Sequence, residues 1–285
     1  GREQPSNARF PLKTYGRIVD VLLIIAVAGW FFVRTFILYE AEMSIVKERI
    51  LYGFVAIVVW ISGWIQIFAH FLQLGNDAGY RLFFTILFMS NAGIAQGVQM
   101  ITSIILCLLT YFTPSRIVTA IRTSLFLLLF FTFAWSGHAA QGGSLMLSHV
   151  IHMAAISIWF GGLIGLTVHS FKMEIRADSL TYFQQKVTLF SRYALGFIVL
   201  VILSGLFLSV SYVKGWELFF QSSYGQTLLF KLVLFLPILL LGALHRYVWL
   251  PQLRKGDESK ARRLAWGMRI ELLLAIALIV IAGLL

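Results

Sequence analysis

The sequence predicts an all-α polytopic membrane protein, a bundle of about eight transmembrane helices. Of its 285 residues, 59% are hydrophobic and only 12% are charged, whereas about 25% of the residues in a typical soluble domain are charged. Apolar runs of about twenty residues recur along the chain, and each is long enough to cross a hydrocarbon core of about 30 Å. The sequence has no nucleotide-binding loop, no acidic cluster and no arrangement typical of a serine nucleophile. We therefore expect a membrane protein that is not an enzyme.

Eight segments have the length and apolar character of a span. We expect them at residues 17–39, 50–73, 88–112, 117–136, 145–170, 187–213, 225–249 and 264–285. The stretch "LQLGNDAGYRLFFTILFMSNAG" after the second span leaves two interpretations open. It can be an outer loop with a helix at the membrane surface, its aromatic residues at the level of the lipid headgroups. If it inserted instead, the chain would have nine spans.

The basic residues predict how the chain is oriented. The flanks between spans 1–2, 3–4, 5–6 and 7–8 hold 16 of the 23 lysines and arginines, and the opposite flanks hold the remaining 7. Because cytoplasmic flanks are enriched in basic residues, the first set should face the cytoplasm. Both termini then lie outside. The net charge of +11 is therefore an orientation signal, and we expect a lipid bilayer and not nucleic acid as the partner.

The first residues differ in character from the rest of the chain. The opening "GREQPSNARFPLK" is polar, contains two prolines and lacks an initiator methionine. We expect residues 1–16 to be a linker from a preceding extracytoplasmic domain and residues 17–285 to form the transmembrane domain. The single cysteine, Cys107, lies in an apolar run and cannot form an internal disulfide.

Four of the six histidines fall near the outer ends of the predicted spans, two of them in "SHVIHM" at 148–153. Residues three or four apart share one face of a helix, so His149, His152 and Met153 should form one patch with Met146 one turn earlier. Ionisable groups inside spans usually mark a site or a pathway. Imidazole and thioether ligands suit copper, Cu(I) above all, far better than magnesium or calcium. The candidate metal ligands are His138, His149 and His152, with Met146, Met153 or His70 completing the set.

Several alternatives remain open at this stage. The methionines can be packing residues, and His70 can be a hydrogen-bonding group. His169 and His245, at the inner ends of spans 5 and 7, can be an exit site or polar groups near lipid headgroups. Histidines on different spans can also clamp a haem, as in a b-type cytochrome or quinone-linked redox protein. A third alternative is a membrane sensor or anchor that does not transport.

An ordered set of short motifs resembles the CopD/PcoD copper-transport family. The motifs lie mainly between residues 117 and 252: "SGHA" at 136–139, "HMAAISIWFGGL" at 152–163, "FSRYAL" at 190–195, "YGQTLLFKLVLF" at 224–235 and "LGALHR" at 241–246. The family's functional histidines correspond to His138 and His152. Two positions depart from the family pattern: His149 stands where an acidic residue is frequent, and His245 where asparagine is frequent.

The resemblance implies an eight-helix protein of the bacterial cytoplasmic membrane that moves copper inward. It also implies a CopC-like copper-binding domain outside the membrane, separate or, in Gram-positive relatives, fused ahead of the membrane part. The copper ion, Cu(I) or Cu(II), would be captured on the outer face.

Overall fold

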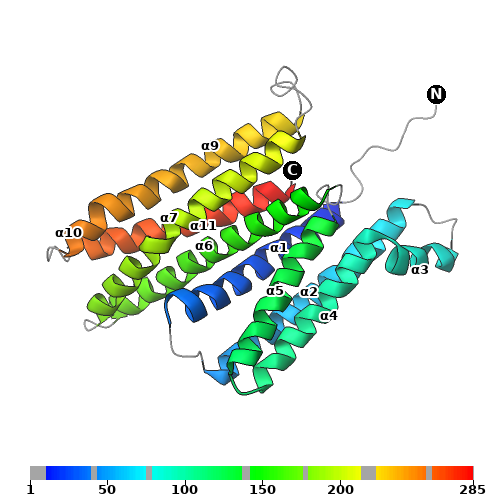
Figure 1. Ribbon diagram of the computed structural model, residues 1–285, viewed down its shortest axis with the longest axis horizontal. Helices are drawn as coiled ribbons and strands as arrows, with labels where there is room; N and C mark the ends of the chain where they lie inside the picture. The colour runs from blue at the N-terminus through cyan, green and yellow to red at the C-terminus, as the bar shows by residue number, and fades with distance from the viewer. Residues whose placement is uncertain are drawn as a thin grey trace. The chain divides into compact units, whose positions relative to one another are not determined.

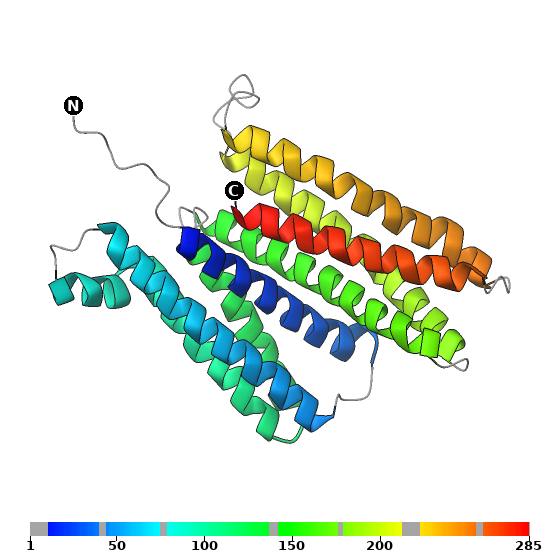
Figure 2. The same cartoon turned by 180° about the vertical axis from the view of Figure 1, so that it is seen from behind.

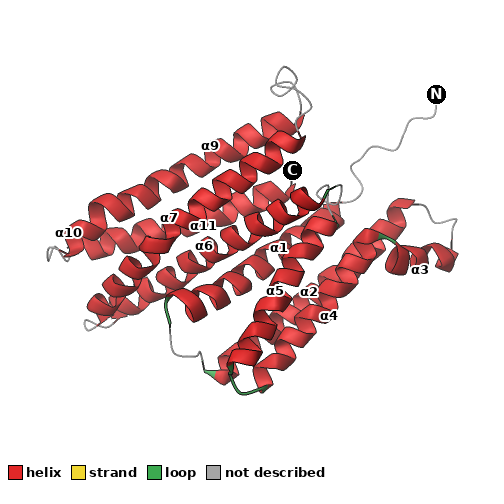
Figure 3. Ribbon diagram, in the orientation of Figure 1, coloured by secondary structure: helices red, strands yellow, loops and turns green. Residues whose placement is uncertain are grey.

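In the computed structural model, the described residues are 11–39, 44–74, 79–136, 142–175, 179–212, 223–254 and 259–284. They form helices joined by short connections and contain no strand (Figure 3). Eight of the helices are long and apolar enough to cross a membrane. The prediction of an all-α protein with eight candidate spans is confirmed.

The helices follow one another along the chain with short breaks. They are α1 (Pro11–Phe32), α2 (Ile45–Leu74), α3 (Gly79–Met89), α4 (Asn91–Leu108), α5 (Arg116–Trp135), α6 (Gly143–Ile175), α7 (Ser179–Tyr212), α9 (Ser223–Leu244), α10 (Leu250–Arg254) and α11 (Ser259–Leu284). A π-helical segment, Val33–Ile37, extends α1, and a second one, His245–Trp249, joins α9 to α10.

Each predicted span overlaps one of the eight long helices, but several helices begin earlier than predicted. The first starts at Pro11 instead of residue 17, and the sixth starts at Ser179 instead of residue 187. Basic residues near these ends interrupt the apolar runs without ending the helices. Lys186, for example, lies within α7 and donates a hydrogen bond to the carbonyl of Leu38 at 2.6 Å. Hydropathy therefore located the spans but understated their length.

The ambiguous stretch after the second span contains a short separate helix. This helix, α3, has 11 residues, which corresponds to about 16 Å at 1.5 Å per residue. It is too short to cross a membrane, so the part of the chain that the structure describes has eight candidate spans and not nine. Ser90 then caps α4, its side chain accepting a hydrogen bond from the backbone N–H of Gly93 at 2.9 Å.

The chain divides into two compact units. Unit 1 comprises residues up to Ile24 and Glu42–Met146, and unit 2 comprises Ile25–Ala41 and Leu147–Gly283. In unit 1, α2, α4 and α5 lie side by side (Figures 1 and 2). A buried ion pair ties α2 to α5, because Arg122 Nη1 lies 2.8 Å from Glu48 Oε1. The same guanidinium donates a hydrogen bond to the carbonyl of Leu109 at 2.9 Å.

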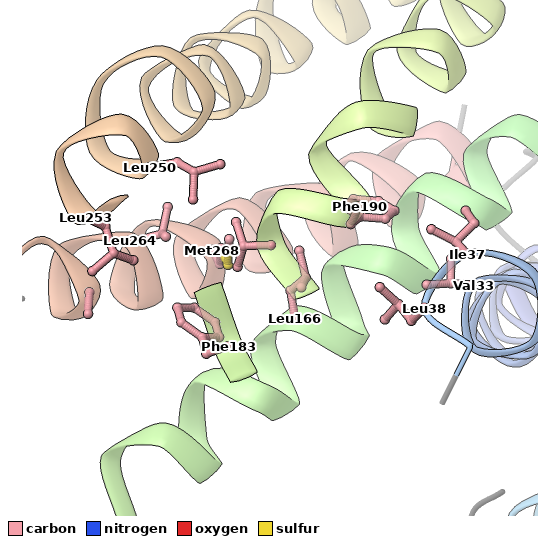
Figure 4. Close-up of a cluster of buried hydrophobic side chains, with 12 residues drawn as sticks. Val33, Ile37, Leu38, Leu166, Phe183, Phe190, Leu250, Leu253, Leu264 and Met268 are labelled. Atoms are coloured by element: carbon pink, nitrogen blue, oxygen red, sulfur yellow. The ribbon is translucent and has the colours of Figure 1, made fainter. Parts of the chain in front are cut away.

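Unit 2 is a bundle of long helices, in which α6, α7, α9 and α11 run alongside one another (Figures 1 and 2). Its core cluster joins the π-helical segment after α1 to α6, α7, α10 and α11, with Leu166, Phe190 and Met268 among its members (Figure 4). The backbones of α1 and α6 meet closely at Gly29 and Gly161, where a Cβ on either residue would overlap backbone atoms of the other helix. The "WFGGL" motif at 159–163 thus allows the close helix approach that its small residues predict.

Candidate metal centre

His152 lies in the first part of α6, in unit 2, where its ring is partly buried against α7. Its Nδ1 atom is 2.9 Å from the hydroxyl oxygen of Ser204. That hydroxyl donates its single hydrogen to the carbonyl of Leu200 within α7. Ser204 therefore accepts from the imidazole, which places the proton on Nδ1 and leaves the lone pair of Nε2 available to a ligand.

The neighbouring residues of α7 shape the space around the ring. A Cβ at Gly205 would lie 3.1 Å from Cε1 of His152, so the glycine gives the imidazole room. Ser148 on α6 donates a hydrogen bond to the carbonyl of Ser204 at 3.4 Å. A metal-binding histidine usually donates its second ring N–H to a neighbouring oxygen, which fixes the ring orientation. His152 has this arrangement.

The other predicted ligands have different surroundings. Met153 is buried, at 8% exposure, and His149 is partly buried on the same helix. His70 belongs to unit 1, where Lys13 Nζ lies 3.1 Å from its Nδ1.

Among the described residues, no group of three or more His, Cys, Asp or Glu side chains is placed to bind a metal ion. His138 lies outside the described residues, so its proximity to His149 and His152 stays a prediction. Met146, in the first turn of α6, is partly buried. A metal centre around His152 therefore needs further ligands beyond the His, Cys, Asp and Glu side chains of the described residues.

Unit 2 also contains a partly open cavity of about 150 Å³. Its lining is mostly apolar, with Trp159 and Phe190 among the residues that form it, but it also includes His245, Glu271 and Met268. His245 Nδ1 lies 2.9 Å from Glu271 Oε2, and both side chains are buried. The cavity wall thus carries nitrogen, carboxylate oxygen and thioether sulfur, all of which are possible ligands of a transition metal.

Local packing holds the His245 ring in place. His245 begins the π-helical segment that continues to Trp249, and π-helical turns are frequent at functional sites. The ring lies against Gly267 of α11, where a Cβ would overlap Nε2 of His245 and come within 2.6 Å of Cζ3 of Trp249. Sequence reasoning identified His245 but missed Glu271, although an acidic residue in an apolar span was the available signal. His169 is also buried, and its ring packs edge-on against Tyr182.

Comparison with known proteins gives three results. Residues 184–285 match the family described as CopD, copper resistance protein D. Over 147 residues the chain is 32% identical to the copper transport protein CutJ of Bacillus subtilis (strain 168), covering 50% of this chain and 27% of CutJ. Over 197 residues it is 25% identical to the inner membrane protein YebZ of Escherichia coli (strain K12), covering 67% of this chain and 65% of YebZ.

In both cases the match covers less than two thirds of the relative's own length. No solved structure matches the chain significantly.

Proposed function

We propose that this chain carries copper ions inward across a bacterial cytoplasmic membrane, because residues 184–285 match the copper resistance protein D family. The family and the eight candidate spans agree with a multi-pass copper transport protein. One relative is named a copper transport protein, which supports copper as the transported ion. The other is named an inner membrane protein, which supports the cytoplasmic membrane as the location.

The observation that carries the proposal is the fixed orientation of His152. The Ser204 hydroxyl oxygen accepts a hydrogen bond from Nδ1–H of His152. The Nε2 atom can therefore bind copper without a change of tautomer. We assign His138 and His149 as the companions of His152, with Met146, Met153 or His70 completing the set. Imidazole nitrogen with thioether sulfur favours copper over magnesium and calcium, and it suits Cu(I) best.

The cavity in unit 2 would be a second binding site for the copper ion. His245, Glu271 and Met268 all lie within the segment that matches the family. A carboxylate offsets the cost of moving a cation into an apolar interior. We place this cavity on the exit side, after capture near His152, because the sequence puts His245 at the cytoplasmic end of its span.

The proposal also assigns the side of the membrane on which the termini lie and the domain that delivers the copper. The excess of basic residues on one set of flanks supports extracytoplasmic termini. With its N-terminus outside, the chain would receive copper from a CopC-like domain, fused ahead of the first helix or separate from the chain. Transport of an ion requires no chemical step, so the proposed activity is not enzymatic.

Copper accumulation in cells tests this function. We expect cells that express the wild-type chain to accumulate more copper than cells without it, and His152→Ala to remove most of the difference. Ser209→Ala is the matched control, because the Ser209 hydroxyl donates a hydrogen bond within α7, to the carbonyl of Gly205, and contacts no histidine in the hydrogen bonds of the described residues. Equal accumulation in wild-type and His152→Ala cells, at equal protein levels in the membrane, would refute the proposed role.

A further inference from the structure

Only three acidic residues lie within the eight spans found in the described part of the chain: Asp20, Glu48 and Glu271. Two of them have a basic partner, since Glu48 pairs with Arg122 at 2.8 Å and Glu271 pairs with His245 at 2.9 Å. Asp20 is different. It is buried in unit 1, at 1% exposure, and its hydrogen-bond partners are neutral side chains.

Side chains from two other helices converge on one oxygen of Asp20. Oδ2 accepts a hydrogen bond from Gln66 Nε2 of α2 at 2.7 Å and another from Gln96 Nε2 of α4 at 3.2 Å. The other oxygen, Oδ1, is buried and has no hydrogen-bond partner among the described residues. One oxygen of the carboxyl group therefore accepts two hydrogen bonds, and the other accepts none from the described residues.

The hydrogen-bond network fixes which atoms of Gln66 face the carboxyl group. Gln66 Nε2 also lies 3.1 Å from the hydroxyl oxygen of Ser62, and that hydroxyl donates to the carbonyl of Gly16 at 3.0 Å. Because the Ser62 hydrogen is used by Gly16, its oxygen must accept from a donor, which is the amide nitrogen of Gln66. The amide therefore presents N–H groups to Asp20.

Two glycines allow the helices to close around this cluster. A Cβ at Gly16 would lie 2.9 Å from Cγ of Gln66. A Cβ at Gly63 would lie 2.6 Å from the sulfur of Met100 and 3.1 Å from Nε2 of Gln96. The helices α1, α2 and α4 can approach one another closely at these points, which encloses the carboxyl group.

No charged group on these three helices neutralises Asp20. On α1, Arg17 is exposed one turn away, and Lys13 lies two turns away with its ammonium at His70 of α2. The remaining charged residues of α2 are Lys47, Glu48 and Arg49, at the opposite end of that helix, and α4 contains no ionisable side chain apart from Cys107. The nearest basic group of α5 along the bundle, Arg122, is paired with Glu48.

We propose that Asp20 is a proton-binding site, which takes up and releases one proton each time the protein moves copper. An ionised carboxylate buried without a cation is strongly disfavoured, so Oδ1 needs a positively charged partner. A hard metal ion requires several oxygen ligands, whereas the neighbouring glutamines present N–H groups. A proton needs one oxygen. Loading forms an O–H bond at Oδ1, and release breaks it with the proton leaving to water, without any electron transfer.

Infrared spectroscopy tests the binding of the proton directly. We expect wild-type protein in lipid to show the C=O stretch of a protonated carboxylic acid and Asp20→Asn to lack it. Glu48→Gln is the matched control and should keep the band, because the Glu48 carboxylate already has the Arg122 guanidinium as its partner. If Asp20→Asn retains the whole band throughout a pH titration, Asp20 does not bind the proton and the proposal fails.

Isotope labelling tests, without a substitution, whether the carboxylic-acid band comes from an aspartate. The chain has four aspartates, at positions 20, 77, 178 and 257, and Asp20 alone lies within a described span. Carboxyl-¹³C aspartate should shift the carboxylic-acid band of the wild-type protein. An unshifted band would assign it to another residue type and overturn the proposal.

The coupling to copper rests on the proposed function and needs its own measurement. Proteoliposomes loaded with a pH-sensitive dye should show copper uptake with simultaneous proton movement. Asp20→Asn should still bind copper but lose the proton movement. Copper uptake without any pH change in the wild type would overturn the coupling. Absence of copper uptake in the wild type would instead refute the proposed function, while the infrared result would still decide whether Asp20 binds a proton.

Discussion

The imidazole of His152 and the hydroxyl of Ser204 lie 2.9 Å apart and join α6 to α7 at the candidate metal centre. The contact fixes the tautomer of the histidine, because the hydroxyl hydrogen is already donated to Leu200. Loss of such a supporting hydrogen bond typically lowers metal affinity by about 10- to 100-fold. We therefore expect Ser204→Ala to weaken copper binding by about this factor, as measured by copper titration of the purified protein.

Ser209→Ala should bind copper as tightly as the wild type, because Ser209 bonds within α7 and does not contact His152 in the hydrogen bonds of the structure. Equal affinities for wild type and Ser204→Ala would contradict the role of the His152–Ser204 contact.

Two glycines of unit 2 should respond to alanine in opposite directions. Gly161→Ala places a Cβ against the backbone of Gly29, and overpacking of this kind costs about 1–3 kcal/mol. A Cβ added at Gly196 has no atom within 4 Å. Gly196→Ala should therefore stabilise α7 by about 0.5–1 kcal/mol. Unfolding in detergent, followed by circular dichroism, measures both changes. A Gly161→Ala variant as stable as Gly196→Ala would show that α1 and α6 do not meet at this point.

His245 and Glu271 should act as a pair in stability measurements. Removing one partner of a buried pair costs about 3–5 kcal/mol, because the other is left uncompensated. We expect His245→Ala and Glu271→Ala each to destabilise the protein, and the double variant to lose much less than the sum. A double-mutant cycle on the free energy of unfolding gives this coupling. Additive effects of the two substitutions would mean that the pair makes no net contribution.

Purified protein should be colourless. A b-type haem, the main alternative use of histidines on several helices, would give an intense Soret band. We expect no such band in protein purified from cells supplied with haem. A Soret band in the wild type that disappears in His152→Ala would show that this site binds haem and not copper.

The positions of the eight spans were predictable because each is a local property of the sequence, an apolar run of sufficient length. The shared face of His149, His152 and Met153 follows from helical periodicity for the same reason. The role of Ser204 was not predictable, since it lies 52 residues from His152 along the chain.

Asp20 illustrates the same limit. The sequence shows an acidic residue in the first predicted span, but its partners Gln66 and Gln96 come from 46 and 76 residues further along. Glu48 lies just before the second predicted span, between Lys47 and Arg49, and its partner Arg122 is likewise distant along the chain. Only the tertiary contacts show that one carboxylate faces a guanidinium and the other faces amides.

Copper uptake by proteoliposomes that contain the purified protein tests the central claim most directly. We expect time-dependent accumulation of Cu(I) inside vesicles with the wild-type protein, about the same rate with Ser209→Ala, and little above the protein-free background with His152→Ala. Uptake by His152→Ala at the wild-type rate, or wild-type uptake no faster than that of protein-free vesicles, would contradict it.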